Sequence, residues 1–371
     1  MEPMKRKAAA AGQGSKPAGP GTPPPPPPRR RGFNLIEIAE TAMAYPERTS
    51  ADFAMDIPED DFRWIADWGF DFVRVCMNYR LWTRGEELFT VDEAMLAKID
   101  RVVELGHKYG IHISLDMHRG PGKWEVPPRS KPLNLWKDQV AVDAFAFHFG
   151  VLARRYKGIP SGQLSFDLLN EPERVGGPEG LTLPWYEKWV RACVAAIRAE
   201  DSRRLIVNEG PRWARDYCLP LEELGMAWSF HCWDPISLSH WGTGWEKKEG
   251  WPCPTWPMAR PVAGWPHNDD YHETYDRAGL ERHIKHWLDL ADRGVSLSCG
   301  ETGLYHKTPH GVGLAWLGDL LDLLKAHRIG FACWSLHGTF GLLDCLRDDA
   351  TLVDWHGHQM DRDLLKLLQA H

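Results

Sequence analysis

The chain has 371 residues, a formal net charge of −7 at pH 7 and a pI of about 6.2. This length suits one large domain, and the mild acidity leaves no basic face that would attract nucleic acid. The sequence contains no run of about 18 apolar residues, so it predicts no segment that spans a membrane.

The first 31 residues are predicted to be a disordered segment rich in Pro, Ala and Gly. Residues 23–28 are an uninterrupted proline run, which adopts extended conformers and buries no apolar surface. The segment lacks the apolar core of a secretion signal. Arg30-Arg31-Gly32-Phe33 resembles a twin-arginine export motif, but the residues that follow are too acidic for a signal core. The chain as written is therefore expected in the cytoplasm, with secretion from another start site or by an unusual route as the alternative.

Residues 32–371 are predicted to form one domain in which strands and helices alternate. Apolar runs predict strands at 33–36, 72–77, 111–116, 164–169, 205–208, 226–230, 295–299 and 331–334. Helical spacing and end signals predict helices at 58–68, 90–110, 140–156, 280–293, 314–327 and 361–370, and one that starts at Pro184. The helix at 90–110 is opened by the capping-box pattern Thr90-Val91-Asp92-Glu93. Strands separated by helices indicate a parallel sheet, and eight of them indicate a closed (β/α)8 TIM barrel.

A long Trp/Pro-rich loop at 234–276 follows the sixth predicted strand. It contains Trp241, Trp245, Trp251, Trp256 and Trp265 among prolines and glycines. A loop this long in a compact domain is usually functional or disordered. A flat apolar ring with one N–H suits the face of a sugar, so Trp241 and Trp245 are predicted to contact substrate beyond the cleavage point, with a structural role as the alternative.

The eight cysteines favour reduced thiols over a disulfide scaffold. Cys76, Cys299 and Cys333 lie inside predicted strands, and the sequence has no CxxC pair and no Cys/His metal-binding spacing. Neither a metal site nor a cofactor is predicted.

Two carboxylates carry most of the functional information. Glu171 follows the fourth predicted strand and Glu301 follows the seventh. Acidic groups at the carboxyl ends of different barrel strands meet at one mouth, and a pair there matches what glycosidic-bond cleavage requires. A helix-terminal acid and a structural ion pair are the respective alternatives. Glu209 also closes a strand and is expected to be a supporting hydrogen-bonding group more than a catalytic acid.

In its ordered set of motifs the chain resembles glycoside hydrolase family 5, the cellulase-type branch of the 4/7 barrel clan, from Arg31 to the C-terminus. The matching fragments are Arg31-Gly32-Phe33-Asn34-Leu35, Val73-Arg74-Val75, Leu115-Asp116-Met117-His118, Asn170-Glu171-Pro172, His231-Cys232-Trp233-Asp234-Pro235, Gly300-Glu301-Thr302-Gly303 and Trp334.

This resemblance implies a role for each matched residue. Glu171 would be the acid/base, with a raised pKa, and Glu301 the nucleophile, kept ionised by Arg74. The implied substrate-binding residues are Arg74, His118, Asn170, His231, Trp233 and Trp334. The plainer readings are a barrel-interior ion pair for Arg74, satisfied core histidines for His118 and His231, core packing for Trp334 and a structural role for Asp116.

One residue departs from the family pattern. The family usually carries tyrosine where this chain has Trp233, and that phenol hydrogen-bonds the nucleophile. An indole offers one N–H donor and no acceptor, and it is larger.

The predicted function is a retaining β-glycoside hydrolase that acts on β-linked glucan-type oligo- or polysaccharides through a covalent glycosyl-enzyme intermediate. It is expected to be endoglucanase-like, with a mannanase or an exo-β-glucosidase also open. A carbohydrate-binding barrel with little or no catalysis is the alternative function. The expected partner is a β-linked carbohydrate, with no nucleic acid and no membrane.

Overall fold

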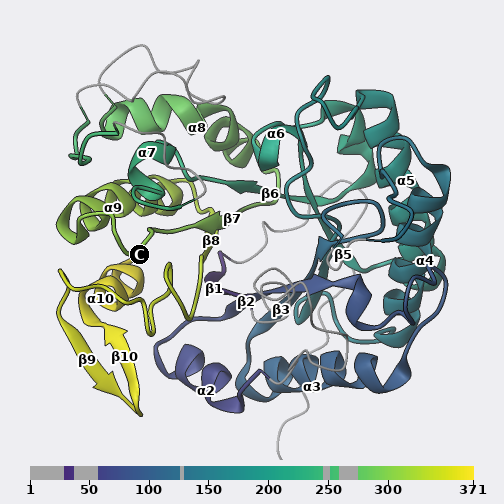
Figure 1. Cartoon of the computed structure of the whole chain (residues 1–371), viewed down its shortest axis with the longest axis horizontal. Coiled ribbons are helices and arrows are strands. Elements are labelled where there is room, and N and C mark those ends of the chain that lie inside the picture. Colours follow the sequence, from purple (N-terminus) through teal and green to yellow (C-terminus); the bar gives the residue numbers. More distant parts are fainter. Residues whose placement is uncertain (1–28, 37–56, 126–128, 245–250, 259–274) are drawn as a thin grey trace, which may run out of the picture.

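The computed structural model describes residues 29–36, 57–125, 129–244, 251–258 and 275–371. Eight parallel strands form a closed barrel in sequence order, and β1 pairs with β8 to complete it (Figure 1). The strands are β1 Arg31–Leu35, β2 Phe72–Asn78, β3 His112–Arg119, β4 Leu164–Asp167, β5 Leu205–Glu209, β6 Ala227–His231, β7 Leu297–Thr302 and β8 Gly330–Cys333. The predicted (β/α)8 TIM barrel is confirmed.

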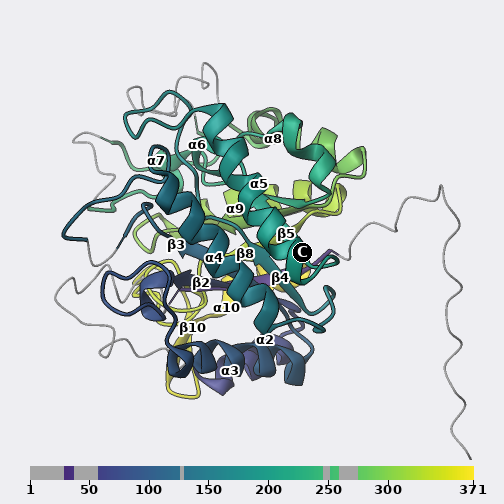
Figure 2. The same cartoon turned by 90° about the vertical axis from the view of Figure 1, so that its right-hand side faces the viewer.

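The long helices surround the barrel, and α4 and α5 lie side by side on its outside (Figures 1 and 2). They are α2 Glu59–Asp67, α3 Glu93–Tyr109, α4 Gln139–Arg155, α5 Leu183–Glu200, α8 Arg277–Asp292 and α9 His310–Ala326. Shorter elements are η2 Tyr79–Leu81, α6 Pro211–Ala214, η3 Leu219–Leu224 and α7 Ile236–Ser239. After the barrel come a hairpin, β9 Leu352–Trp355 and β10 His358–Asp361, and α10 Arg362–Ala370. No helix within these described parts is long and apolar enough to cross a membrane.

Several element ends differ from the sequence prediction. Helix α3 is capped by Asp92, whose carboxylate accepts the N–H groups of Ala94 and Met95, so the cap is not Thr90. Strand β7 extends through Glu301 because its register with β6 shifts there. Strand β4 ends at Asp167, two residues earlier than predicted, which leaves Glu171 on an irregular segment. These shifts matter because they set the positions of the two candidate carboxylates.

The boundary predicted after residue 31 lies slightly too late. Arg29 donates from Nε to the carbonyl oxygen of Ile329, and Arg31 opens β1. Both residues therefore belong to the barrel. Residues 1–28 lie outside the described structure, so their disorder stays a prediction.

The apolar core lies mainly between the strands and the surrounding helices, and it absorbs part of the tryptophan excess. Among the residues that the structure describes, five tryptophans are fully buried: Trp82, Trp189, Trp228, Trp287 and Trp316. All eight cysteines are free thiols, and only Cys253 among them is exposed.

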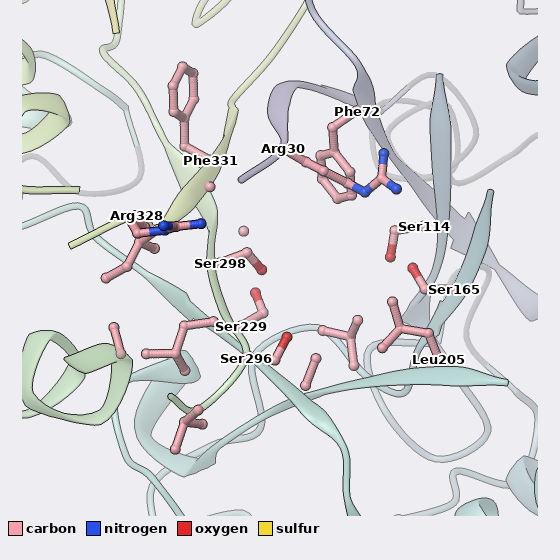
Figure 3. A pocket seen from close by; sticks show the side chains of 18 of the residues that line it. Arg30, Phe72, Ser114, Ser165, Leu205, Ser229, Ser296, Ser298, Arg328 and Phe331 are labelled. Atoms are coloured by element: carbon pink, nitrogen blue, oxygen red, sulfur yellow. The ribbon is translucent and has the colours of Figure 1, made fainter. Parts of the chain in front are cut away.

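The lower part of the barrel interior is hollow. A cavity of about 400 Å³ opens there, and its wall includes Ser114, Ser165, Ser229 and Ser298 (Figure 3). Bulky branched side chains usually fill these layers of a TIM barrel. Serines leave the space open. Asp167 lies at its inner end, where its Oδ1 has no protein partner among the described residues.

We expect Gly32→Ala to lower the free energy of unfolding by about 3 kcal/mol, in line with overpacking of a close contact. A Cβ at Gly32 would lie 1.7 Å from the carbonyl oxygen of Phe72 on β2, and this backbone atom has no room to move. Gly150→Ala is the matched control, because a Cβ there meets nothing within 4 Å. Alanine in the middle of α4 should stabilise the protein by about 1 kcal/mol. Urea unfolding of both variants measures this, and equal free energies for the two would contradict it.

Candidate active site

The interior of the upper barrel is organised around Arg74 of β2. Its guanidinium contacts four buried carboxylates: Nε lies 2.9 Å from Asp167, Nη1 2.8 Å from Glu301, and Nη2 2.9 Å from Glu209 and 3.0 Å from Asp116. These acids come from four different strands, and each side chain is at most 6% exposed. Arg74 therefore fixes the relative positions of strands that are far apart in the sequence.

Two asparagines complete the shell around Arg74. Asn34 accepts from Nη1 at 3.0 Å and donates to the carbonyl oxygen of Gly300 at 2.9 Å. Asn170 accepts from Nη2 at 2.9 Å through its side-chain oxygen. The amide nitrogen of Asn170 is therefore the end that can donate to a ligand hydroxyl.

Glu171 is held from three sides in a strained backbone conformation. Its φ is 48°, a left-handed value that is uncommon for any residue except glycine. The Glu171 N–H donates to Oε2 of Glu209 at 2.8 Å, and its carbonyl oxygen accepts from Nζ of Lys123 at 3.1 Å. Its side chain is 26% exposed. Strained residues persist where the surrounding contacts over-determine them, as they often do at functional sites.

His231 links the acidic groups. Its Nδ1 lies 2.7 Å from Oε1 of Glu171 and 3.5 Å from Oε2 of Glu301, and its Nε2 lies 2.9 Å from Oε1 of Glu209. Burial lowers the pKa of His231, but the charges of Glu209 and Glu301 and the hydrogen bonds outweigh it and raise the pKa well above its usual value. A doubly protonated ring donates to both sides, which matches this arrangement.

The candidate pair holds one proton across neutral pH. Burial raises the pKa of Glu301 to about 8, against the lowering effect of His231 and Arg74. Burial acts in the same direction on Glu171, but the hydrogen bond and charge of His231 outweigh it and lower that pKa to about 2. The two carboxyls therefore share one proton near neutral pH, in a cluster where His231 lies close to both. The contact between His231 and Glu171 matches the expectation that one of the two histidines hydrogen-bonds the acid/base.

The two carboxylates are close enough to act on one bond. A carboxylate oxygen of Glu171, one of Glu301 and a nitrogen of His231 lie within 4.8 Å of one another. These three residues could bind a metal ion. The negative charges of Glu171 and Glu301 are, however, already balanced by their contacts to Arg74 and His231.

His118 and Trp334 lie together on another side of the site. Their rings stack with centroids 5.5 Å apart, and Nδ1 of His118 lies 2.8 Å from Oδ2 of Asp116. Burial lowers the pKa of His118 well below its usual value, so the ring is neutral. The partly exposed indole of Trp334 offers a flat wall. Asp116 is fully buried and positions the wall only indirectly, through its hydrogen bond with His118.

Trp233 takes no part in positioning Glu301 through a hydrogen bond. It packs in an apolar cluster with Ile236, Tyr305 and Phe340, and its ring centroid lies 5.7 Å from that of Phe340. Within the described residues, no hydrogen bond joins its Nε1 to Glu301. Its effect on the candidate site is therefore one of shape.

The predicted loop at 234–276 is described only in part. Trp241 is partly buried in a turn after α7, whereas Trp245 and Trp265 lie outside the described residues, so their contact with substrate stays a prediction. Trp256 donates from Nε1 to Asp319 of α9 at 2.8 Å. That tryptophan anchors the loop to the barrel.

Sequence reasoning missed four residues of this site: Asn34, Lys123, Asp167 and Ser229. Lys123 is buried, pairs with Glu173 at 2.5 Å and supports the carbonyl of Glu171. Ser229 donates to Glu209 at 3.3 Å. Asp167 stands out in the sequence as an acid inside an apolar run, which was the available signal for it. Nothing in the sequence distinguishes Ser229.

Comparison with known proteins agrees with this geometry. The family model described as cellulase (glycosyl hydrolase family 5) matches residues 40–339. The chain belongs to glycosyl hydrolase family 5. It is therefore a glycosidase of the cellulase-like kind, and the resemblance read from its motifs is confirmed.

Individual relatives of this family 5 chain are moderately similar. Cellodextrinase A of Ruminococcus flavefaciens is 25% identical over 75% of this chain and 77% of its own length. Endoglucanase C of Acetivibrio thermocellus is 26% identical over 75% of this chain and 83% of its own. A crystal structure described as a glycoside hydrolase has a TM-score of 0.81 and 31% identity, covering 92% of this chain and 99% of that one. Thermotoga maritima Cel5A in complex with cellobiose has a TM-score of 0.69 and 20% identity, covering 91% of this chain and 96% of that one, and shows the same fold.

We expect Glu301 to titrate near pH 8 in the ligand-free protein. The Glu171→Gln variant should lower this pKa, because the negative charge of Glu171 is one of the influences that raise it. Carbon-13 NMR of the glutamate carboxyl groups measures the titration, with assignment from a Glu301→Gln spectrum. Glu87→Gln is a control on an exposed residue and should leave the pKa unchanged. A Glu301 signal that stays ionised down to pH 5 would contradict the single-proton assignment.

Proposed function

We propose that this family 5 enzyme is a retaining β-glycoside hydrolase, with Glu301 as nucleophile and Glu171 as acid/base. The observation that carries the proposal is the approach of the two carboxylates, whose oxygens lie within 4.8 Å. Retaining enzymes separate the two carboxyls by about 5–5.5 Å, whereas inverting enzymes leave about 6.5–9.5 Å for a water molecule. One oxygen of each carboxyl within 4.8 Å of the other supports the shorter, retaining separation.

The reaction then follows in two displacements. The carboxylate of Glu301 attacks the anomeric carbon while Glu171 gives its proton to the departing glycosidic oxygen, so the glycosidic bond breaks as the glycosyl-enzyme ester forms. Glu171, now ionised, takes a proton from water, and the hydroxide attacks the anomeric carbon and releases Glu301. The amide nitrogen of Asn170 donates to the hydroxyl beside the anomeric carbon, a bond that strengthens in the transition state.

The shared proton must be on Glu171 before cleavage. His231 lies between the two acids, 2.7 Å from Glu171 and 3.5 Å from Glu301. We propose that it hands its Nδ1 proton to Glu171 and is reprotonated from Glu301 when substrate displaces water from the mouth. Arg74, at 2.8 Å, then holds the ionised Glu301.

The proposed substrates are β-linked glucan-type oligosaccharides, with β-1,4-glucan as first choice. The names of the relatives, a cellodextrinase and endoglucanases, support this class. The wall formed by Trp334 and His118 suits the apolar face of a pyranose ring. A Thermotoga maritima Cel5A structure holds mannotriose, so mannan-type chains belong in the same substrate screen.

We expect Glu301→Ala to lower kcat on cello-oligosaccharides on the order of 10⁴–10⁶-fold, as loss of a covalent nucleophile does. Glu171→Ala should lose about 10²–10⁴-fold on the same substrates, the usual contribution of a general acid. It should lose far less on a dinitrophenyl glycoside, because that leaving group departs without a proton. Steady-state kinetics of both variants, with Glu87→Ala as the exposed-carboxylate control, measures these effects.

Product stereochemistry is read in the same samples by proton NMR. Retention gives the β-anomer first, before mutarotation. Initial release of the α-anomer would sink the retaining mechanism. Binding of oligosaccharides without turnover by the wild type would favour a carbohydrate-binding barrel.

Trp233→Tyr should raise kcat/KM by about tenfold, the effect of one hydrogen bond to a charged group. The phenol would donate to Glu301 and favour its ionised form. The smaller ring should also lower the free energy of unfolding by about 1–2 kcal/mol, because it leaves space beside Phe340. Trp233→Phe is the matched control, since it leaves a similar space without a hydroxyl. An unchanged kcat/KM in a folded Trp233→Tyr variant would show that the departure at this position is of no consequence.

A further inference from the structure

A second cluster of potential ligands lies away from the catalytic mouth. It consists of His337 and Asp344, on the loop after β8, and His358, the first residue of β10. One imidazole nitrogen from each histidine and one oxygen of Asp344 lie within 4.8 Å of one another. Oδ2 of Asp344 is 2.7 Å from Nδ1 of His358 and 3.8 Å from Nδ1 of His337. These residues have no place in the catalytic arrangement.

The far side of the His337 ring is held by a buried carboxylate. Nε2 of His337 lies 3.0 Å from Oδ1 of Asp61, which is on α2 and only 2% exposed. A proton on Nε2 would satisfy this contact, and Nδ1 lies on the side of Asp344, 3.8 Å from its Oδ2. Histidines that bind metals usually donate their other N–H to a carboxylate in this way, which fixes the tautomer.

Asp344 is also fixed in orientation, at some backbone cost. Its φ is 55°, in the left-handed region, and two hydrogen bonds to Gln359 hold it there. In one of them Oδ1 accepts the N–H of Gln359 at 2.9 Å, so Oδ2 is the oxygen presented to the histidines.

We propose that His337, Asp344 and His358 bind a divalent transition-metal ion, with Zn²⁺ as the first choice. Two imidazole nitrogens and one carboxylate oxygen form a borderline ligand set that suits zinc. Zinc–ligand bonds of about 2.0–2.2 Å place tetrahedral ligand atoms about 3.3 Å apart, and the two measured separations lie on either side of that value. The three side chains are 22–43% exposed, so an ion can enter and water can complete its coordination.

The ion would act on the structure and not on the reaction. It would join the loop after β8 to β10, with Asp61 extending the connection to α2. The same loop begins at Trp334, the flat wall of the active site, and contains Phe340, which packs on Trp233. A metal at His337 would therefore hold the base of the loop that carries this wall.

The test uses the full chain without an affinity tag, stripped with a chelator. Titration with Co²⁺ should produce d–d absorption bands that saturate at one equivalent, and Zn²⁺ should abolish them. Calorimetry should give a Zn²⁺ affinity at least tenfold weaker in His358→Gln and in Asp344→Asn. Asparagine tolerates the left-handed backbone at 344, so this variant removes the charge without forcing a new fold. Asp61→Asn should weaken Zn²⁺ binding by about 10–100-fold, the usual effect of losing an outer partner.

His107→Gln is the control, an exposed histidine on α3 that should leave Zn²⁺ binding unchanged. Glu171→Gln separates this site from the candidate active site and should also leave the stoichiometry at one. Absence of Co²⁺ bands in the wild type would overturn the proposal. Equal Zn²⁺ affinity in His358→Gln and wild type, or loss of binding in Glu171→Gln alone, would overturn it as well. None of these readings depends on glycosidase activity.

Discussion

The rest of the structure depends on one buried guanidinium. Arg74 contacts carboxylates from β3, β4, β5 and β7, and its five N–H donors in a planar fork are what allow one side chain to do so. Lysine would keep the charge but could not hold four acids in fixed directions. The same contacts that close the upper barrel therefore also place Glu301 and, through Glu209 and Asn170, Glu171. The same contacts therefore determine both the stability of the barrel and the geometry of the site. Removing Arg74 would leave several buried carboxylates without a cation.

The positive charge of Arg74 cannot balance all the buried carboxylates around it. Some of these carboxyl groups therefore have raised pKa values and retain a proton more easily. Burial raises the pKa of Asp167 and Glu301, and that of Asp116 to about 6. His231 supplies a second positive charge and contacts Glu171, Glu301 and Glu209. The excess of acid over base thus provides what general acid catalysis needs, a proton stored in a dry site at neutral pH.

The sequence predicted the barrel, the order of its strands and both carboxylates, because apolar runs and strand-end acids are local signals. It predicted Arg74 and Glu209 as supporting groups, but not the other neighbours. Asn34, Asp167 and Ser229 act through contacts between strands, and their geometry depends on barrel register, which local patterns do not specify. The backbone conformation of Glu171 follows from the early end of β4 and from Glu209, a residue 38 positions away. His337, Asp344 and His358 are separated in the sequence by spacings that match no common metal motif, so only the fold assembles them.

The substrate wall and the charge network are connected through one histidine. Trp334 stacks on His118, which is hydrogen-bonded to Asp116, and Asp116 contacts Arg74. A sugar packed on Trp334 would therefore be connected to the charge network. The connection runs from Trp334 through His118 and Asp116 to Arg74, which also holds Glu301. Trp334 also packs against the apolar cluster that contains Trp233 and Phe340. The wall is therefore held both by its stacking on His118 and by apolar packing, while Arg74 and His231 hold the reacting carboxylates in place.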